Sequence, residues 1–421
     1  MQRTPTIAIA GAGIGGLTAA ILLARAGFHV LLLEREPAPS TAGAGIQVTP
    51  NAGRILAALG LDDAIAAVAA EPESIVVRSA RGGQRIVAMP LGERFARGFG
   101  LPYRTVHRAD LHGILLTAAT AEAGVELRSD HEVVEYAEHG NGLTIVAETS
   151  HGDAEFQAAA LIGADGIGSR IRGRIPDAAE RTPTGRAAWR LVIPAAALPE
   201  GIAADQVGLW LGAAGHVVHY PVRRGAEFNI VAVVPDAGPG PGTIAAMRDR
   251  LGSWARPVRA LLAVDGDWQR WPIGTVDPRG AWTSGRDALI GDAAHAMAPY
   301  LAQGGAMAIE DAAILSALLA ADPGAPAEAM AAYEAERRRR VARVWRAART
   351  TADLYHMGTL TAAVRNFGMR FLGGRALLNR YAWIYRWDAA PEKGKRRPKA
   401  APSSPDRPDE VRRDPAGWQR P

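Results

Sequence analysis

The chain has 421 residues, 48% of them hydrophobic, which suits one large or two moderate domains with a sizeable core. It contains no cysteine, which excludes disulfides, thiol nucleophiles and thiolate metal sites and fits a cytoplasmic protein. The formal net charge is +5, but nine basic and five acidic residues lie within 391–421, so the remaining chain is almost neutral and a nucleic-acid partner is not indicated.

The first predicted elements form a strand–helix–strand unit. An apolar strand over residues 6–10 leads into a glycine turn, a helix covers about 15–26, and a second strand covers 28–33. A secretory signal needs a longer apolar region of about 7–15 residues, so this N-terminus is expected to be a strand rather than a leader.

The glycine turn has the spacing of a dinucleotide-binding loop. In GAGIGG, the GxGxxG pattern permits a tight turn, close approach of a pyrophosphate, and close packing of helix on strand. Glu34 follows 18 residues after the last glycine of the pattern, where it would bind an adenosine ribose and disfavour a 2′-phosphate. The pattern predicts one site for NAD or FAD, formed by Gly11, Gly13, Gly16 and Glu34.

Two further motifs end apolar strands in an acid. One strand ends at Asp165 in ALIGADGIGSRIR, and another ends at Asp292 in GDAAHAMAPY. If both strands join the nucleotide-binding sheet, the carboxylates lie at its carboxyl edge, where an acid suits a polyhydroxyl chain such as ribityl. Arg172 could pair with Asp165 or with a phosphate. Gly304 and Gly305 would let a ring or a phosphate approach the amides of the next helix.

The chain divides by pattern into a nucleotide-binding part, an inserted sheet and a helical C-terminal part. Short β-like segments alternate with Gly and Pro turns in the middle of the chain, which predicts an antiparallel sheet there. The Pro- and charge-rich tail is expected to be disordered. The predicted parts are a nucleotide-binding domain at 1–184 and 276–330, with a β-rich segment at about 74–107 as a candidate member of the sheet, a sheet domain at 185–275, helices at 331–387 and a basic tail at 388–421.

The three motifs, in this order and spacing, resemble those of the FAD-dependent aromatic hydroxylases, the single-component flavoprotein monooxygenases with the para-hydroxybenzoate hydroxylase fold. GAGIQVTPNAGRIL, HRADLH and HVVHYPV are most similar to the branch with salicylate hydroxylase and 3-hydroxybenzoate 6-hydroxylase, and the resemblance covers about residues 5–387. It implies an α/β fold (α+β overall) with a Rossmann-like FAD-binding domain, an inserted antiparallel-sheet substrate domain and a C-terminal helical region. Departures from the branch at Leu191, Ala296 and Ala382 leave the substrate open.

The resemblance implies an enzyme that holds FAD non-covalently and uses NADH or NADPH as a transient reductant. Dioxygen would add to the reduced flavin to give a C4a-hydroperoxide, which hydroxylates a small aromatic substrate, expected to be a salicylate-like phenolic acid. A homodimer is a family expectation. The cofactor residues that the resemblance and the motifs assign are Gly11, Gly13, Gly16, Glu34, Arg35, Arg108, Asp165, Asp292, Gly304 and Gly305.

Candidate substrate residues lie in HVVHYPV and in the third motif. Side chains alternate along a strand, so His216 and Tyr220 share one face. With the resemblance, we predict His216 as the base that deprotonates a phenol, and Tyr220 and Gln303 as groups that orient the substrate. Pro299 would lie on the substrate side of the flavin.

Other conspicuous residues are expected to be structural. His295 and Tyr300 are predicted to pack in the core, and the arginine-rich stretch 336–349 is predicted to be the solvated face of a long helix. The sequence has no metal-ligand cluster and no uninterrupted apolar run of the ~18–20 residues that span a membrane, so neither a metal nor a membrane is expected.

Two other functions stay open. One is a related flavoprotein oxygenase that acts on an N-heteroaromatic acid, a polyketide or a quinone precursor. The other is a non-enzymatic nucleotide- or nucleic-acid-binding protein, which would leave three separately spaced cofactor motifs unexplained.

Overall fold

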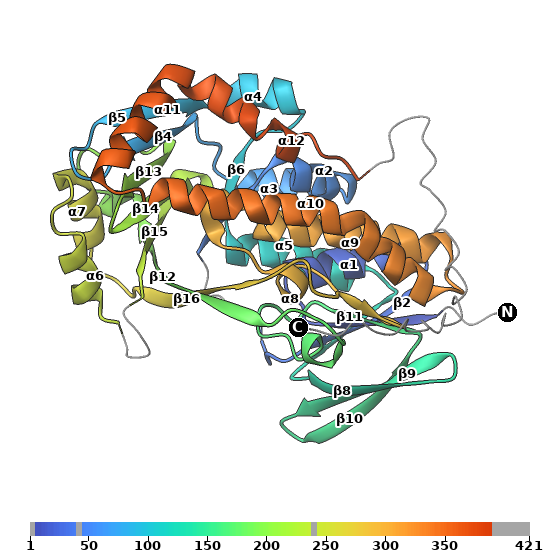
Figure 1. The fold of residues 1–421 in the computed structure, drawn as a ribbon. Helices are drawn as coiled ribbons and strands as arrows, with labels where there is room; N and C mark the ends of the chain where they lie inside the picture. The colour runs from blue at the N-terminus through green and yellow to red at the C-terminus, as the bar shows by residue number, and fades with distance from the viewer. Residues whose placement is uncertain (1–4, 39–43, 237–241, 390–421) are drawn as a thin grey trace, which may run out of the picture. The chain divides into compact units, whose positions relative to one another are not determined.

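The computed structural model describes residues 5–38, 44–236 and 242–389, so the predicted basic tail lies outside it except for Asp388 and Ala389. Two sheets shape the functional part of the described chain. One is a parallel sheet that carries the glycine loop, and the other is a larger sheet built mostly from the inserted segment (Figure 1).

The parallel sheet has six strands in the order β17–β18–β11–β1–β2–β7, and every neighbouring pair is parallel except β17 with β18. Its strands TIAIA, HVLLLE and ALIG are near-continuous apolar runs, as expected where both faces are covered. Because parallel strands end at the same edge, the turns after β1, β11 and β18 meet there. The strands are β1 (Thr6–Ala10), β2 (His29–Glu34), β7 (Val125–Ser129), β11 (Ala160–Gly163), β17 (Thr283–Ser284) and β18 (Asp287–Leu289).

Helices pack on one face of this sheet, and a three-stranded antiparallel sheet packs on the other. Within the described chain, only α9 is long and apolar enough to cross a membrane, and it is a mostly buried helix of this core. The covering elements are α1 (Ile14–Arg25), α5 (Arg108–Ala121), α9 (Gly304–Ala321) and α10 (Pro326–Tyr355) on one side, and β8 (Glu132–His139), β9 (Gly142–Thr149) and β10 (Gly152–Ala158) on the other.

The larger sheet has seven strands in the order β16–β12–β15–β14–β13–β4–β5. All its pairs are antiparallel except β13 with β4, so the antiparallel sheet predicted for 185–275 is confirmed, and the one parallel pair is made with a strand from outside that segment. β4 comes from the first part of the chain, and local alternation within 185–275 cannot reveal its direction. The strands are β4 (Ser74–Ser79), β5 (Arg85–Pro90), β12 (Arg181–Pro194), β13 (Gln206–Gly212), β14 (Gly215–Val222), β15 (Glu227–Pro235) and β16 (Gln269–Val276).

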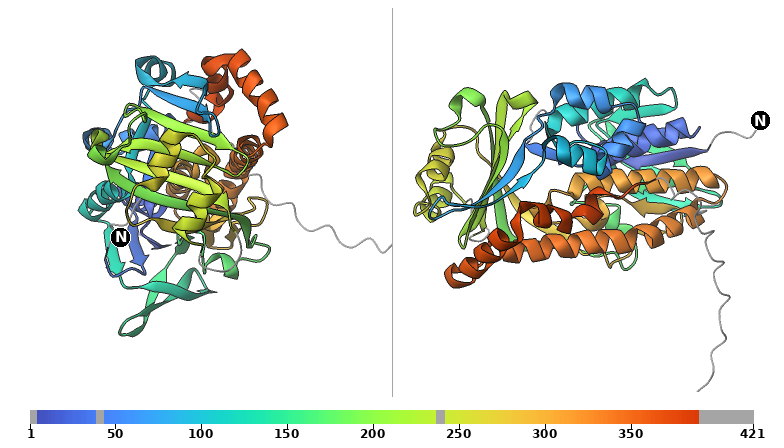
Figure 2. Two further views of the ribbon diagram at one scale, coloured as in Figure 1. Left: turned by 90° about the vertical axis from the view of Figure 1, so that its left-hand side faces the viewer. Right: turned by 90° about the horizontal axis from the view of Figure 1, so that it is seen from above.

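Alternation gives this sheet an outer and an inner face. The outer face, with Val217, Phe228 and Ile230, packs against the helices α6 (Ile244–Arg250) and α7 (Arg256–Ala263). The inner face is turned toward the rest of the chain, and α10 extends beside both sheets to the C-terminal helices (Figure 2). The remaining elements are β3 (Gly45–Val48) paired with β6 (Arg104–His107), α2 (Pro50–Ala58), α3 (Asp62–Val68), α4 (Gly92–Phe99), α8 (Asp292–His295), α11 (Thr359–Arg380) and α12 (Ala382–Tyr385).

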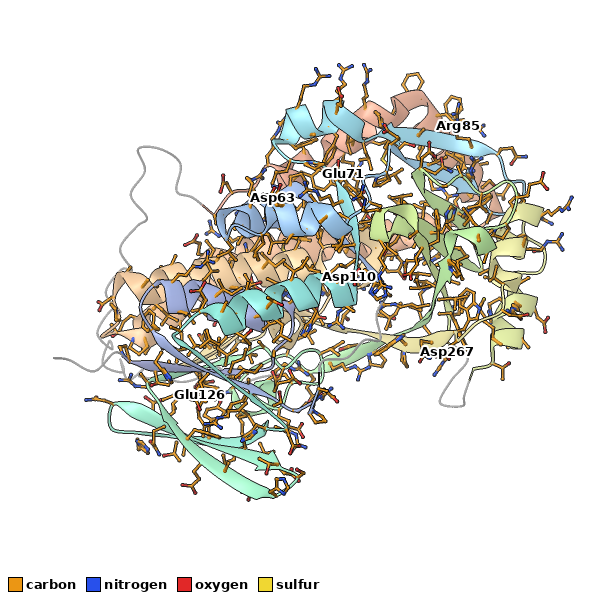
Figure 3. All side chains as sticks on the ribbon, turned by 180° about the vertical axis from the view of Figure 1, so that it is seen from behind. Asp63, Glu71, Arg85, Asp110, Glu126 and Asp267 are labelled. Carbon is orange, nitrogen blue, oxygen red and sulfur yellow. The ribbon has the colours of Figure 1, made fainter. Side chains whose placement is uncertain are left out.

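An ion pair links the two halves at the surface. Asp110, labelled in Figure 3, lies in the first turn of α5 and accepts two hydrogen bonds of 2.9 Å from Arg223, which follows β14. The same guanidinium also pairs with Glu227 at the start of β15. The helical side of the parallel sheet and the seven-stranded sheet are therefore joined by charge as well as by apolar packing.

A buried ion network joins α9 to α10. Arg337 is 1% exposed and donates hydrogen bonds of 2.7 Å to Glu310 and to Asp311. The predicted solvated face is therefore wrong at Arg337, because this turn of α10 faces α9. His295 lies 2.6 Å from the second oxygen of Asp311 and packs against Trp282. Burial raises the pKa of Asp311, but the charges of His295 and Arg337 outweigh it and lower that pKa to about 2.

Candidate active site

The carboxyl edge of the parallel sheet brings the three predicted motifs together. Gly11, directly after β1, has φ 103°, and a side chain there would come within 2.6 Å of the Ala164 carbonyl oxygen. Glycine is therefore required for the first loop to touch the second. Arg172 donates to the carbonyl of Ala293 at 3.0 Å and to that of Ile167 at 2.8 Å, so it joins the second motif to the third rather than binding a carboxylate.

The glycine loop is held on one side by Glu34 and is open to solvent at Gly13. Glu34 accepts hydrogen bonds from the backbone amides of Ala12 at 2.7 Å and Glu36 at 2.9 Å. A side chain at Gly13 would meet no atom within 4 Å, so the loop faces open space where a pyrophosphate would approach. His112, in HRADLH, lies 2.8 Å from the Ala12 carbonyl and supports the loop, a role that the sequence did not predict.

Asp292 lies in a recess at the same edge. Its side chain is accessible to solvent, yet enclosure by the surrounding protein raises its pKa, while the charges of His295, Arg108 and Arg190 act in the opposite direction. A side chain at Gly304 would meet only an oxygen of Asp292, at 3.7 Å. The recess therefore places an acid beside open backbone at a helix start.

Two buried polar atoms at this edge have no hydrogen-bond partner in the described chain. They are Oδ1 of Asp165 and Nε of Arg190, and burial raises the pKa of Asp165. With the open loop and the Asp292 recess, these atoms fit FAD, since a ligand with phosphates, hydroxyls and a polar ring could satisfy them. Arg35 is exposed and donates to Glu36 at 3.3 Å, at the outer rim of this region.

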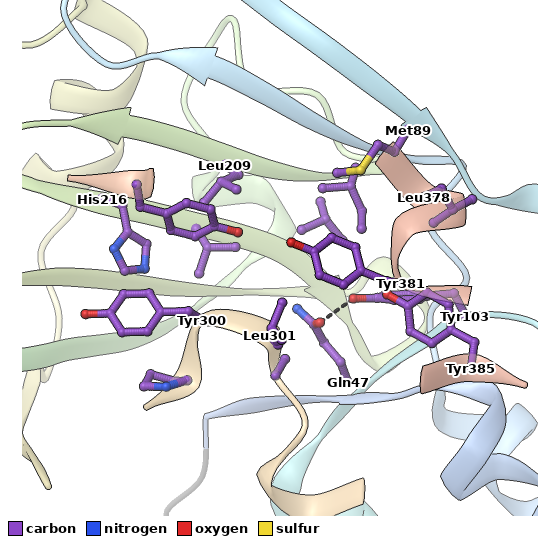
Figure 4. Close-up of a pocket in the computed structure, with 16 residues that line it drawn as sticks. Gln47, Met89, Tyr103, Leu209, His216, Tyr300, Leu301, Leu378, Tyr381 and Tyr385 are labelled. Carbon is purple, nitrogen blue, oxygen red and sulfur yellow. Dashed lines mark hydrogen bonds between the residues drawn. The ribbon is translucent and has the colours of Figure 1, made fainter. Parts of the chain in front are cut away.

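The inner face of the seven-stranded sheet forms one wall of a cavity of about 120 Å³ (Figure 4). An apolar cavity of about 150 Å³ holds a benzene molecule, so this one is comparable in size to a single aromatic ring, though somewhat smaller. Strand pairing places the side chains of this wall in register on one face. The wall comprises Ile75, Met89, Val207, Leu209, His216 and Val218, and the opposite side comprises Gln47, Tyr103, Pro299, Tyr300, Leu301, Ala302, Tyr355, Leu378, Tyr381 and Tyr385.

His216 lies in this wall and is 4% exposed. Its Nδ1 is 3.0 Å from Nε2 of His356, and the rings of Tyr300 and Tyr355 pack around it at centroid distances of 5.3 and 5.2 Å. Burial, together with the charges of His356 and Arg186, lowers the pKa of His216 well below its usual value. At neutral pH its imidazole is therefore neutral, with one donor and one acceptor nitrogen.

The structure does not bring all the predicted substrate residues to this cavity. Pro299 lines it, whereas Tyr220 is buried on the same sheet face against Gly45, and burial raises its pKa. Gln303 accepts a hydrogen bond from Asn51 at 3.0 Å and donates one to Thr49 at 3.1 Å. Its side chain thus holds the start of α9 to α2 and does not line the cavity.

Several cavity residues had no assigned role in the sequence. Tyr300, which was expected to be structural, is buried and also lies beside His216 in the lining. Tyr355, Tyr381 and Tyr385 come from the C-terminal helices, and Tyr103 donates a hydrogen bond to Gln47 (Figure 4). The helical spacing of Tyr381 and Tyr385 places them on one face, but such spacing does not say which sheet that face meets.

Comparisons with known proteins give consistent relatives. Residues 3–348 match the family described as FAD binding domain. The chain is 36% identical over 385 residues to 3-hydroxybenzoate 6-hydroxylase 1 of Aquipseudomonas alcaligenes, covering 90% of this chain and 96% of that protein. It is 38% identical over 359 residues to 3-amino-4-hydroxybenzoate 2-monooxygenase of Streptomyces cremeus, covering 85% and 89%. Klebsiella pneumoniae HpxO complexed with FAD and uric acid has a similar structure, with a TM-score of 0.79 at 26% identity over 90% of this chain and 96% of that one.

Proposed function

The chain belongs to the FAD binding domain family and, within it, to the FAD-dependent aromatic hydroxylases, and from this premise we propose that it hydroxylates a small phenolic acid in the His216 cavity. The observation that carries the substrate proposal is this cavity, sized for one ring and bearing a neutral histidine in its wall. The relatives named for hydroxybenzoate substrates support the same class.

In this proposal, residues at the edge of the parallel sheet hold the cofactor, and residues of the cavity bind the substrate. When bound, FAD supplies the reduced ring that activates dioxygen. The glycine loop, Glu34, Asp165 and Asp292 would hold it at the edge of the parallel sheet. His216 accepts the phenol proton, which makes the substrate ring more electron-rich, and the tyrosine-rich lining excludes water from the reaction.

Arg186 is our candidate for the substrate carboxylate. It lies on β12, on the same sheet face as His216. Arg186 pairs with Pro235 of β15 and His216 pairs with Val233, and residues two apart on a strand share a face. Its charge acts on His216, Tyr300 and His356, and its Nη1 is buried without a hydrogen-bond partner in the described chain. A carboxylate would supply that partner and compensate the buried charge.

We propose NADH or NADPH as the transient reductant. The sequence has one dinucleotide loop, and its Glu34 suits FAD, so the nicotinamide cofactor would bind without a second loop of this kind. We also propose a cytoplasmic location, which the cysteine-free sequence fits.

A homodimer is proposed from one exposed face of α11. Leu360, Val364, Phe367 and Phe371 recur at helical spacing and are 87%, 74%, 71% and 82% exposed. Contiguous apolar surface of this kind marks interaction sites, and a second copy of the chain would cover it.

A second substrate class is favoured by one comparison. HpxO, whose structure is similar, holds uric acid, so an N-heteroaromatic substrate would also be consistent with this fold. The cavity has polar groups at both ends, at His216 and at the Gln47–Tyr103 pair, which such a ring could use.

The first test uses purified protein reconstituted with FAD. Consumption of NADH and of NADPH is followed with salicylate, 3- and 4-hydroxybenzoate, gentisate and 6-hydroxynicotinate, while hydroxylated product and hydrogen peroxide are both quantified. Stimulation with matching product from a phenolic acid is the expected result. Stimulation by 6-hydroxynicotinate alone would select the second class, and no stimulation in protein that holds FAD would refute both.

A further inference from the structure

The neighbour of His216 has no role in the chemistry derived so far. His356 follows the last residue of α10, and its Nε2 lies 3.0 Å from Nδ1 of His216. This contact occupies one ring nitrogen of His216 and leaves Nε2 as the nitrogen available to the cavity. Which of the two imidazoles donates the shared proton decides whether that Nε2 is a donor or an acceptor.

The proposed reaction decides this choice. For His216 to accept the phenol proton, its Nε2 must be unprotonated, so the neutral imidazole carries its proton on Nδ1. Nδ1 of His216 then donates to Nε2 of His356, 3.0 Å away, and the neutral His356 ring carries its own proton on Nδ1. Burial lowers the pKa of His356 to about 4, so its ring is neutral and can accept this hydrogen bond.

We infer that His356 is a positioning residue that fixes the tautomer of His216, so that Nε2 of His216 faces the substrate as an acceptor, and that it then relays the accepted proton toward solvent. This inference rests on the proposed function, because it assigns the base of that reaction. It adds a residue from the helical C-terminal part to a site otherwise built on strands and loops.

The proton steps balance without another reactant. The phenol O–H bond breaks as an N–H bond forms at Nε2 of His216. The proton on Nδ1 of His216 moves to Nε2 of His356, and the proton on Nδ1 of His356 leaves to water. The direction follows from burial, since His216 is 4% exposed while His356 is only partly buried.

The surroundings keep the pair neutral before substrate binds. The positive charge of Arg186 lowers the pKa of both histidines, and that of Arg365 lowers the pKa of His356. Protonation of either ring is therefore disfavoured. Tyr300 and Tyr355 pack against His216, and Tyr300 in turn feels the charge of Asp353. Within the described chain, these are the charged and titratable groups that act on the pair.

The inference can be tested by NMR without turnover. In protein labelled with nitrogen-15 at histidine, the ring nitrogens of His216 are assigned by their loss in His216→Gln. We expect a protonated Nδ1 and an unprotonated Nε2 in the wild-type protein. In His356→Leu we expect a mixture of the two tautomers, whereas His356→Gln, whose amide oxygen can accept from Nδ1, should keep the wild-type tautomer. A protonated Nε2 in the wild-type protein would overturn the inference.

Kinetics separate the relay from the positioning role. In His356→Leu, kcat/KM for the best phenolic acid should fall at least about tenfold, as for loss of general-base catalysis. The pH at which the bound substrate ionises, read from its absorbance, should rise. His356→Gln should recover the substrate ionisation but only part of kcat, and Met357→Leu at the neighbouring position should match wild type. Flavin content, measured for each variant, reports folding.

The two hypotheses fail differently. If no aromatic acid stimulates the wild-type protein, the proposed function fails, and the tautomer measurement still decides the inference. If the wild-type protein turns over and His356→Leu keeps both its pH profile and its kcat/KM, the inference is wrong while the proposed function stands.

Discussion

Asp292 is the residue through which the cofactor site is most directly tested. Replacing it with Ala should weaken FAD binding at least about tenfold, because hydrogen bonds to a charged group contribute about 1.5–3 kcal/mol each. The measurement is titration of apoprotein with FAD, followed by flavin fluorescence. Asp153→Ala, at an exposed position of β10, is the matched control and should bind FAD like wild type. Equal affinity in Asp292→Ala would mean that the turn after β18 does not contact the cofactor.

His219, on the outer face of β14, gives the protein a defined dependence on pH. Burial lowers the pKa of His219 from its ordinary value of 6.5 to about 3. Below pH 6.5, therefore, His219 binds a proton in the unfolded chain but stays neutral in the folded chain. The contribution of His219 to stability is present above that pH and is lost as the pH falls toward the folded value, by up to about 1.4 kcal/mol per pH unit.

Replacement of His219 by Gln should therefore flatten the acid side of the stability profile. The free energy of unfolding, measured in urea between pH 7.5 and 4.5, should fall less steeply with acid in the variant. Asp287, whose pKa is raised to about 6 mainly by burial, acts in the opposite direction over part of this range. Since it is present in both proteins, the difference between the two profiles isolates His219. Identical slopes would contradict the assignment of a buried, neutral imidazole.

The sequence predicted the position of a residue correctly where a short motif contains both the end of a strand and the turn that follows it. The glycine loop, Asp165 and Asp292 meet at one sheet edge because parallel strands must end together. The place of the Gln303 side chain could not be predicted in this way, because it is hydrogen-bonded to Asn51 and Thr49, about 250 residues earlier in the chain. His356 carries no local signal, since its importance comes from a contact with β14 that helical periodicity cannot predict.

At the scale of elements, α9 and α10 are joined by buried ion pairs in which Arg337 contacts both acids. Replacement of Arg337 by Ala should lower the free energy of unfolding by about 3 kcal/mol, the low end for breaking a buried pair, because Glu310 keeps Arg340 and Asp311 keeps His295 as partners. Arg339→Ala, two residues along the same helix and exposed, should change stability by less than about 0.5 kcal/mol. Urea unfolding at constant flavin saturation measures both variants. Equal stabilities would show that the buried network contributes nothing net.

The same elements show where patterns were sufficient. Alternation in HVVHYPV correctly placed His216 and Tyr220 on one face, because a strand has no other periodicity. The charge pattern of α10 gave a wrong prediction at Arg337. A run of arginines is typical of a solvated face, and the sequence does not show that Arg337 pairs with Asp311, 26 residues earlier. The antiparallel pairing predicted for 185–275 is confirmed, whereas the parallel β13–β4 pair joins strands about 130 residues apart, whose relative direction local alternation does not predict.

At the scale of the whole molecule, the exposed face of α11 determines the expected assembly. Phe371→Glu should convert a dimer to a monomer, because two such carboxylates would be buried in a symmetric contact. Light scattering coupled to size-exclusion chromatography measures the mass. Arg339→Glu, an exposed position on α10, is the control for an added carboxylate. A monomeric wild-type protein, or a Phe371→Glu dimer, would contradict this use of the face.

The order of strands in the parallel sheet also bears on how the protein is made. β1 pairs with β11, and β11 pairs with β18, so the last strand of the cofactor edge leaves the ribosome only after the whole inserted sheet. Asp292 lies three residues after the end of β18, so a nascent chain that ends before it has the glycine loop but lacks the acid proposed to hold the ribityl chain. Domains generally fold as units during synthesis, and here the inserted sheet can close before its host does. If Asp292 contacts FAD as proposed, cofactor loading follows the synthesis of the whole inserted sheet and is confined to chains that are nearly complete.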